Sequence, residues 1–298
     1  MVSVIIPYYN KQNSVLRAIN SVLNQTFTDW ELIVIDDCSP QALNAHELPS
    51  DNRIQYSQNP QNLGAARTRQ RGLNLSTGAF VAFLDADDWW DHRFLEYCIK
   101  ALESTTKSDG AYVKTKVYHP DGSDSIRKYS DREFYKIRET LIRYARPWQT
   151  GGILWRKSSC GDWGQLKTNE DSWFEISSAK YNCLIPVNLV GYFVDQSGDS
   201  HLSTNFSNCN VATDIQELFL RIFVEERTKL NLGIRITLFT RLLRGQLRIL
   251  EYCGKESALI WRQKLSVHSS ILGALCRNRI IMKVLLRLIQ SSPFKIHF

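Results

Sequence analysis

Three carboxylates lie close together at the end of an apolar segment in the first third of the chain. Residues 80–84 (FVAFL) run directly into Asp85, Asp87 and Asp88. Carboxylates this close repel one another unless a positive charge lies between them, and a hard divalent cation prefers such oxygen ligands. The alternative is that they cap the helix that follows, where aspartate is favoured. A single aspartate would suffice for a cap, so three favour cation binding.

Parallel strands explain how these carboxylates are positioned. An apolar run of this length, bounded by turn residues, is typical of a buried strand in a parallel sheet. Two further runs, 2–7 (VSVIIP) and 30–35 (WELIVI), enclose a helical pattern over 14–24 with Ser14 as its expected N-cap. This is a β-α-β unit, whose strands are parallel. Because open α/β sheets bind ligands at the carboxyl ends of their strands, the loops that follow should share one edge.

The remaining elements alternate up to residue 189. Further strands are expected at 54–56, 111–118 and 184–189, the second of them at an edge of the sheet. Further helices are expected over residues 65–75, 93–102, 131–144 and 172–180. The segment 148–155 (WQTGGILW) is glycine-containing and aromatic, which suits a segment lining a ligand. The tryptophans at 89–90 are expected to pack under the next helix.

The charge of the chain is unevenly distributed along its 298 residues. Residues 218–298 hold 15 Lys and Arg against 4 Glu and no Asp, whereas the whole chain has a net charge of +7. The excess positive charge is therefore C-terminal, which indicates a separate function or partner there. Helices are expected over 214–230, 232–253, 255–267 and 270–290. We expect a catalytic domain over 1–213 and a basic helical region over 214–298.

The cysteine pattern and the hydropathy bear on the compartment. The seven cysteines are scattered, odd in number and form no C-x-x-C pair, which favours reduced thiols over a disulfide framework or a zinc site. No uninterrupted apolar stretch reaches ~18 residues, and no basic leader precedes the strand that begins at Val2. A cytoplasmic location is expected, including the inner face of the plasma membrane.

Five motifs occur in a fixed order: SVIIPYYN, QTFTDWELIVIDDCS, NLGAARTR, FLDADD and NED. As a set, over about residues 1–180, they resemble the family 2 glycosyltransferases. The resemblance implies a GT-A fold, an α/β, Rossmann-like, mostly parallel sheet flanked by helices, here with a C-terminal helical extension. It implies inverting transfer from a nucleotide-sugar, here a UDP-sugar, to a saccharide or lipid-linked saccharide in bacterial surface polysaccharide assembly. Neither a Q-x-x-R-W motif nor transmembrane helices are found, which implies transfer of one sugar per binding event.

The resemblance also assigns the nucleotide site. Its residues are Pro7, Tyr9, Asn10, Asp37, Gly64, Arg69, Asp85 and Ala86. An aromatic ring offers a stacking face to the base or ribose, and a carboxylate such as Asp37 can accept a hydrogen bond from a pyrimidine N–H. Tyr8 either lines this site or packs in the core. Arg69 neutralises the acids or contacts the diphosphate, whereas Arg67 and Arg71 are expected on solvated faces.

The same resemblance assigns the cofactor and the base. Asp87 binds Mn²⁺ or Mg²⁺, while Asp85 reaches the ribose or the metal through water. The cation stabilises negative charge on the departing nucleoside diphosphate. Asp88 either orients its neighbours or caps the next helix. The resemblance makes the pair Glu170-Asp171 catalytic, with Asp171 as the general base for the acceptor hydroxyl. The alternative, an acid that favours the start of a helix, applies better to Glu170 than to Asp171.

Other readings remain open at this stage. His201 either reaches the metal or diphosphate or lies on the surface. The C-terminal helices either bind anionic lipid head groups, at ~1 kcal/mol per basic residue, or pack as a bundle with solvated arginines; no nucleic-acid-binding module is recognised. A nucleotidyltransferase would carry a glycine-rich loop where PYYNKQ has none. A degenerate non-catalytic sugar-binding or scaffold protein would have lost Asp87 or Asp171.

Overall fold

A computed structural model describes residues 1–43, 48–127, 135–143, 146–196, 208–226 and 230–269. Its contacts divide the chain into two compact units. The first comprises Met1–Ile137, Arg146–Gln165 and Phe174–His201, and the second comprises Arg138–Ala145, Leu166–Trp173 and Leu202–Phe298. Each unit is described in turn.

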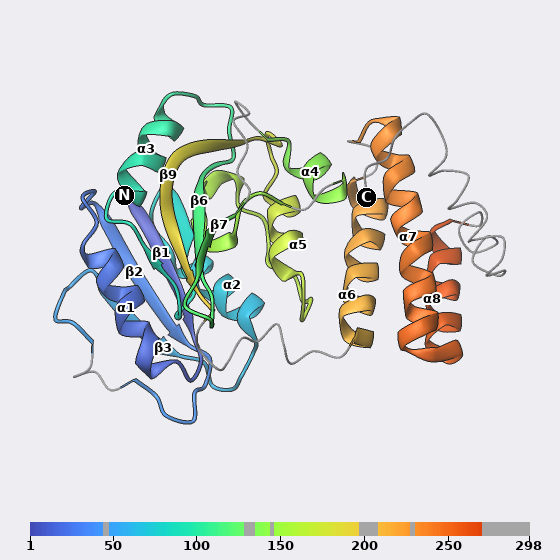
Figure 1. The fold of residues 1–298 in the computed structure, drawn as a ribbon, viewed down its shortest axis with the longest axis horizontal. Helices are drawn as coiled ribbons and strands as arrows, with labels where there is room; N and C mark the ends of the chain where they lie inside the picture. Colours follow the sequence, from blue (N-terminus) through green and yellow to red (C-terminus); the bar gives the residue numbers. More distant parts are fainter. Residues whose placement is uncertain (44–47, 128–134, 144–145, 197–207, 227–229, 270–298) are drawn as a thin grey trace. The chain divides into compact units, whose positions relative to one another are not determined.

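The first unit is built on a nine-stranded sheet (Figure 1). Its strands are β1 (Val2–Tyr8), β2 (Trp30–Asp36), β3 (Ile54–Gln58), β4 (Phe80–Phe83), β5 (Trp89–Trp90), β6 (Gly110–Tyr118), β7 (Asp124–Ile126), β8 (Ile153–Arg156) and β9 (Leu184–Asp195). The order is β3-β2-β1-β4-β8-β6-β9-β5, with β7 paired to β6. Strands β3, β2, β1 and β4 are mutually parallel, and β8 then runs antiparallel to β4. The expected α/β class is confirmed, and the expected mostly parallel sheet holds for β3, β2, β1 and β4, whereas β5, β7 and β8 pair with their neighbours in antiparallel fashion.

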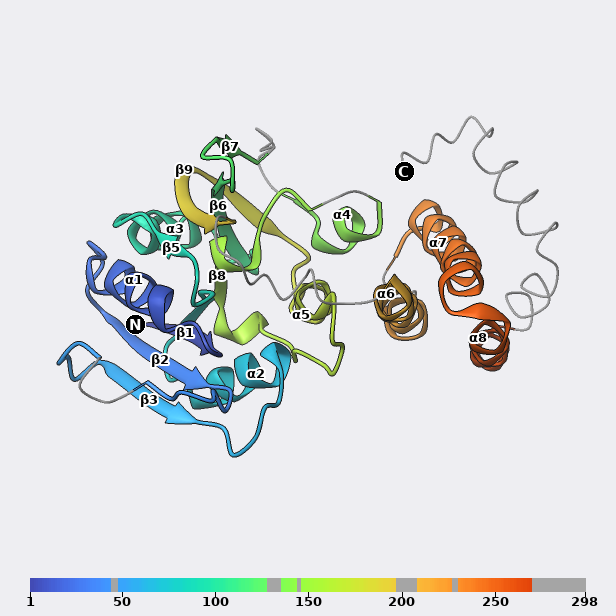
Figure 2. The same cartoon turned by 60° about the horizontal axis from the view of Figure 1, so that its bottom comes forward.

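Helices cover both faces of the parallel strands. The helices are α1 (Gln12–Leu23), α2 (Ala65–Leu75) and α3 (Phe94–Glu103). Because side chains alternate along a strand, Val4 packs in one core with Val15 of α1, whereas Ile5 faces the other side. There α2 comes so close that a Cβ on Gly72 would lie 2.4 Å from Ile5. Figure 2 shows α1 and α2 on opposite sides of β1 and β2.

Three expectations for this unit are wrong. Strand β6 is not at an edge, because it lies between β8 and β9 and is parallel to β9. Segment 148–155 is core rather than a ligand lining: Trp148 and Trp155 are fully buried, and the segment contains the 3₁₀ turn Thr150–Gly152 and strand β8. Helix α1 begins at Gln12, and its N-cap Lys11 makes no side-chain capping bond, so Ser14 is not the cap.

Two short helices complete the elements before residue 200. Helix α4 (Ile137–Arg143) begins later than the helix expected over 131–144, because Tyr135 forms an isolated antiparallel bridge with Leu184 instead. Residues 131–134 and 144 lie outside the described ranges. Helix α5 (Glu170–Ser177) is the helix expected over 172–180, but it begins within the NED motif rather than after it and ends three residues earlier. The strand expected at 184–189 continues to Asp195 as β9.

The second unit contains the helices α6 (Asn208–Arg221), α7 (Leu232–Tyr252) and α8 (Gly254–His268). A π-helical turn (Ile222–Glu226) follows α6 directly. Gly245 lets α6 and α7 touch, because a Cβ there would lie 1.7 Å from Oε1 of Gln216. Gln216 Nε2 in turn donates to the carbonyl of Leu242 at 3.0 Å. The domain boundary predicted between residues 213 and 214 falls inside helix α6. The helix expected over 270–290 lies outside the described residues.

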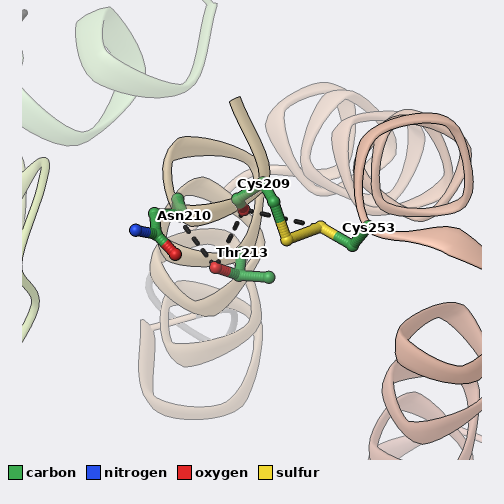
Figure 3. The surroundings of a disulfide bond; sticks show 4 residues. All are labelled: Cys209, Asn210, Thr213 and Cys253. Atoms are coloured by element: carbon green, nitrogen blue, oxygen red, sulfur yellow. Dashed lines mark hydrogen bonds between the residues drawn. A yellow bond between two sulfur atoms is a disulfide. The ribbon is translucent and has the colours of Figure 1, made fainter. Parts of the chain in front are cut away.

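A disulfide joins Cys209 to Cys253 (Figure 3). It links the start of α6 to the residue that ends α7, and Thr213 Oγ1 donates to the carbonyl of Cys209 at 3.1 Å beside it. The expectation of reduced thiols is therefore wrong for this pair, whereas Cys38, Cys98, Cys160 and Cys183 are free. Scattered positions concealed the pair, because only the α6–α7 hairpin brings the two residues together. Among the described helices, none combines the length and apolarity needed to cross a membrane.

Candidate functional site

The carboxyl ends of β1, β2 and β4 meet at one edge of the sheet. The register pairs Tyr8 with Asp36 and Ile5 with Phe83, so the loops after these strands start side by side. The expected shared edge is confirmed. The polar side chains described first come from these loops, from α1, and from the segment after β3 that leads into α2.

Asp37 organises the turn before α2. Its carboxylate accepts hydrogen bonds from the backbone N–H groups of Leu63 at 2.7 Å and Gly64 at 2.8 Å, and from Asn59 Nδ2 at 2.8 Å. Gly64 has a φ of 82°, a left-handed conformation that favours glycine. Two residues expected at the nucleotide, Asp37 and Gly64, are thus in direct contact. Their contact with a base stays a prediction.

Asp85 and Arg69 form an ion pair. Arg69 Nη2 lies 2.6 Å from Asp85 Oδ1, and the guanidinium lies over the ring of Trp163 at 4.8 Å from its centroid. Arg69 is 7% exposed, so this cation stands in a protected place beside the acids. This ion pair matches one of the two roles expected for Arg69, neutralisation of an acid, whereas contact with a diphosphate stays a prediction. Arg71, expected on a solvated face, is half-buried, and its Nη1 donates to Asn59 Oδ1 at 2.6 Å.

Lys11 provides the cation for Asp87. Its Nζ lies 2.9 Å from Asp87 Oδ2. Lys11 follows Asn10, whose φ of 51° and whose N–H···Oγ bond to Ser39 at 2.9 Å turn the chain after β1. Sequence reasoning missed Lys11, although a lysine directly after the strand-exit motif was a usable signal. In the same loop Tyr8 is buried in the core, whereas Tyr9 is 39% exposed.

Two residues of strand β9 hold Asp88 in place. It is 5% exposed, accepts a hydrogen bond from the hydroxyl of Tyr192, and accepts one from the backbone N–H of Asp195 at 3.3 Å. Burial and the charges of Asp85 and Asp87 raise its pKa well above the ordinary value. Asp88 therefore orients the acid loop and does not cap α3, whose N-cap is Arg93. Asp91, two residues before that N-cap, accepts a hydrogen bond from the N–H of Arg93 at 2.9 Å.

Arg17 connects the acid loop to the end of β9. Its Nη2 donates to the carbonyl of Asp87 at 2.6 Å and its Nη1 to Asp195 Oδ2 at 2.8 Å, while its guanidinium lies 4.0 Å from the centroid of Trp89. Trp90 stacks on Phe94 of α3 at 4.3 Å, which confirms the expected packing for that tryptophan. Arg17 was also missed, because its partners lie 70 and 178 residues away.

Glu170 and Asp171 belong to the second unit, where they open α5. Asn169 before them has a φ of 59°, and Thr168 donates from its N–H and its hydroxyl to Asp214 Oδ2 at 2.8 and 3.0 Å. Asp171 Oδ1 accepts from Ser172 N–H at 2.7 Å. Both acids are half-buried. Their catalytic roles stay predictions, and His201 lies outside the described residues.

The carboxylates that follow β2 and β4 thus lie at one edge of the parallel strands. Each of them has a hydrogen-bond or ion-pair partner within the protein. The family description Glycosyl transferase family 2 matches residues 3–159, just over half of the chain and all of this edge. The chain belongs to glycosyl transferase family 2. The expected family and its α/β architecture are confirmed.

Similar proteins of this family act in bacterial polysaccharide synthesis. A UDP-Glc:alpha-D-GlcNAc-diphosphoundecaprenol beta-1,3-glucosyltransferase of Escherichia coli is 41% identical over 103 residues, which cover 34% of this chain and 41% of that protein. A putative colanic acid biosynthesis glycosyl transferase of E. coli K12 is 29% identical over 182 residues, covering 57% and 63%. The chain thus spans less than two-thirds of the length of these relatives.

Solved structures share the fold. Residues 1–349 of Staphylococcus aureus TarS, in complex with UDP-GlcNAc, superpose with a TM-score of 0.61 at 18% identity, covering 99% of this chain and 88% of that one. A mannosyltransferase from Pyrobaculum calidifontis, in complex with GDP-Man and Mn²⁺, gives a TM-score of 0.55 at 14% identity, covering 99% and 81%. At these identities the likeness concerns the fold alone.

The carboxylates after β4 fit a divalent cation in this family 2 chain. Among the described residues, no group of three or more acidic, histidine or cysteine side chains converges on a point. Mg²⁺ keeps several waters and uses one or two carboxylates plus substrate phosphates, so a closed protein cluster is not needed. Asp87 supplies such a carboxylate, and its present cation, Lys11, shows that positive charge is accepted there.

Proposed function

We propose that this chain is an inverting glycosyltransferase that moves one sugar from a UDP-sugar to a saccharide or lipid-linked saccharide acceptor. The observation that carries the proposal is the sheet edge at which Asp37, Asp85 and Asp87 each have a defined protein partner. A role in bacterial surface polysaccharide synthesis is supported by the relatives of that function. The relative from E. coli is named for UDP-Glc and for a lipid diphosphate acceptor, which supports both substrate classes.

The donor is held by residues after β1, β2 and β4. The exposed ring of Tyr9 offers a stacking face to the base, and Asp37 retains acceptor capacity beyond its contacts with the turn. Arg69 places a protected positive charge beside the diphosphate. A bound Mg²⁺ or Mn²⁺ held by Asp87, with Asp85 nearby, supplies further stabilisation of the negative charge that develops on the leaving group.

The transfer needs one base. The acceptor oxygen forms a bond to the anomeric carbon as the bond from that carbon to the diphosphate breaks, and the configuration inverts. We assign the acceptor proton to the carboxylate of Asp171, while the bond electrons leave with the nucleoside diphosphate. The acceptor is presented at the cytoplasmic face of the membrane through the basic region 214–298, which is part of the same proposal.

The test of donor binding is a panel of nucleotide-sugars measured by calorimetry with and without Mn²⁺. UDP-sugars should bind more tightly with the metal present, and Asp87→Ala should remove that dependence. Asp124→Ala, which changes an exposed carboxylate paired with Lys116, is the matched control. If no nucleotide binds with Mn²⁺ or Mg²⁺ present, the proposal is wrong.

The test of the base is Asp171→Asn. Donor binding should be unchanged, while transfer to an acceptor should fall by about 10²–10⁴-fold, the usual contribution of a general base. Asp121→Asn, at an exposed carboxylate that accepts a hydrogen bond from the N–H of Ser123, is the matched control and should retain full activity. A normal transfer rate in Asp171→Asn would refute the assignment of this residue and leave the donor site untouched.

A further inference from the structure

Asn59 is a buried residue whose side chain bonds to the carboxylate of Asp37. It is 2% exposed. Its Nδ2 donates to Asp37 Oδ1 at 2.8 Å and to Thr68 Oγ1 at 2.9 Å, while its Oδ1 accepts from Arg71 Nη1 at 2.6 Å. The amide cannot turn over, because its oxygen would then face a carboxylate and its NH₂ group would face a guanidinium.

The backbone on both sides of this contact is fixed as well. The N–H of Asn59 donates to the carbonyl of Asp36 at 2.7 Å, and the N–H of Asp37 donates to the carbonyl of Tyr8 at 2.7 Å. Arg71 Nη1 also donates to the carbonyl of Gln58 at 2.9 Å, at the end of β3. A continuous chain of hydrogen bonds therefore runs from Arg71 through Asn59 to Asp37.

The contacts of Asp37 occupy most of its capacity as a hydrogen-bond acceptor. An ionised carboxylate has about four lone-pair positions, two on each oxygen. Oδ1 accepts from Asn59 Nδ2 and from the N–H of Leu63, so both of its positions are taken. Oδ2 accepts from the N–H of Gly64. With these donors, the ones found within the described ranges, a single acceptor position is left on Oδ2.

Nucleotide bases differ in what they offer to such a carboxylate. Uracil has one ring N–H, at N3, between two carbonyl oxygens. Guanine has two donors side by side, N1–H and the N2 amino group, which need an acceptor position on each carboxylate oxygen. Cytosine has an acceptor nitrogen at N3, which a carboxylate repels. A single acceptor position therefore fits uracil, leaves one donor of guanine unpaired, and opposes the N3 edge of cytosine.

We propose that Asn59, held by Arg71, is a positioning residue that determines base specificity: it leaves Asp37 one acceptor position and so selects uracil over guanine and cytosine. The inference rests on the proposed function, in which Asp37 contacts the base of the donor. Asn59 touches Asp37 and not the base. Without Asn59, a position on Oδ1 becomes free, and Asp37 can then accept both donors of guanine.

The first experiment measures the binding of UDP, CDP and GDP to the full chain by calorimetry with saturating Mn²⁺. All three carry the same diphosphate and metal, so these contributions cancel in the ratios of their dissociation constants. The wild type should bind UDP at least about tenfold more tightly than GDP, because one unpaired buried donor costs that much in affinity. The compound 3-methyl-UDP, which lacks the N3 hydrogen, should likewise bind at least about tenfold more weakly than UDP.

The second experiment repeats these measurements on variants of the network. Asn59→Leu keeps the size of the side chain but removes the donor to Oδ1, so its preference for UDP over GDP should be about tenfold smaller than that of the wild type. Thr68→Val is the matched control, because it removes a bond to the same amide at a buried position and keeps the bond between Asn59 and Asp37. It should have a lower melting temperature and the wild-type preference.

A second substitution at the same position covers a failure of Asn59→Leu to fold. Asn59→Ser places no apolar group in the network, and its hydroxyl ends one atom short of the amide nitrogen, so the preference for UDP should shrink here too. A wild-type preference in either folded Asn59 variant, or an equal loss of preference in Thr68→Val, overturns the inference and leaves the proposed function intact.

Two outcomes in the wild type also decide the matter. Equal binding of UDP and 3-methyl-UDP overturns the inference, because the base is then not held through its N3–H; metal-dependent binding of UDP would still support the proposed function. If none of the three nucleotides binds with Mn²⁺ present, the proposed function is wrong and the inference fails with it.

Discussion

Lys11 and a divalent cation need the same carboxylate. The ammonium group lies 2.9 Å from Asp87 Oδ2, and both partners are partly exposed. Because an ion pair of this kind contributes at most about 1 kcal/mol, a metal can displace the ammonium group. The lysine would then be free to turn toward the donor phosphates.

Lys11→Met should therefore strengthen the binding of Mn²⁺ in the absence of donor. Removing a competitor worth about 1 kcal/mol corresponds to a roughly fivefold gain in affinity. The measurement is a titration of free Mn²⁺ by electron paramagnetic resonance. Lys100→Met, which removes an exposed lysine paired with Glu96, is the control and should change nothing. Unchanged or weaker metal binding in Lys11→Met would contradict the competition.

Single residues of the site differed in how well the sequence predicted them. Asp85, Asp87 and Arg69 could be predicted, because each follows a strand or opens a helix in a recognisable motif. Arg17 and Tyr192 could not, since their effect on the acid loop depends on contacts across 70 and 104 residues. Local patterns identify the groups that do chemistry, whereas the groups that orient them come from distant parts of the chain.

At the scale of elements, Glu31 connects the amino-terminal ends of the parallel strands β1, β2 and β4. It accepts hydrogen bonds from Ser3 Oγ on β1 at 2.6 Å and from Thr77 N–H and Oγ1 before β4 at 2.6 and 2.8 Å. Burial alone would raise its pKa, but these bonds to the ionised form outweigh burial and hold the pKa below the usual 4.5. The ionised carboxylate thus stabilises three strand ends.

Glu31→Gln should lower the free energy of unfolding by about 2 kcal/mol at pH 7, the scale of lost bonds to a charged group. Because the native pKa is depressed, this stabilisation is present above the unfolded-state value of 4.5 and is lost as the pH falls through the native value. Urea unfolding at pH 7 and pH 3 should show a smaller difference between wild type and variant at the lower pH. Glu96→Gln, at an exposed pair, is the control. A difference that does not depend on pH would contradict the assignment.

The disulfide is the second element-scale feature that can be tested. Cys209 and Cys253 close a loop of 44 residues, for which chain entropy predicts up to about 4 kcal/mol of stabilisation. Adding a reductant should lower the melting temperature of the wild type but not that of Cys209→Ser/Cys253→Ser. Cys183→Ser, which changes a free thiol, should respond to reductant like the wild type. Seven titratable thiols in unreduced, denatured protein would show that the bond does not form.

For the whole molecule, the strands and helices were predictable from the sequence, whereas the pairing of strands within the sheet was predictable only in part. The strands and helices of the β-α-β unit follow from apolar runs and from helical periodicity, and parallel pairing follows from the crossover. The position of β6 does not follow from the sequence, because its alternating pattern is typical of a half-exposed edge strand, whereas β8 and β9 flank it in the sheet. Strand β8 was concealed within an aromatic, glycine-containing segment whose tryptophans are buried for packing.

The late strand β9 gives the first unit an order of assembly. It pairs with β6 and β5, and it supplies Tyr192 and Asp195, the partners of Asp88 and Arg17. During synthesis the acid loop leaves the ribosome about a hundred residues before these partners. Contacts so distant in sequence form slowly, because the entropy of loop closure must be overcome first. The carboxylates therefore become ordered only when the sheet is complete, and a partly made chain has no organised site with which to capture a nucleotide.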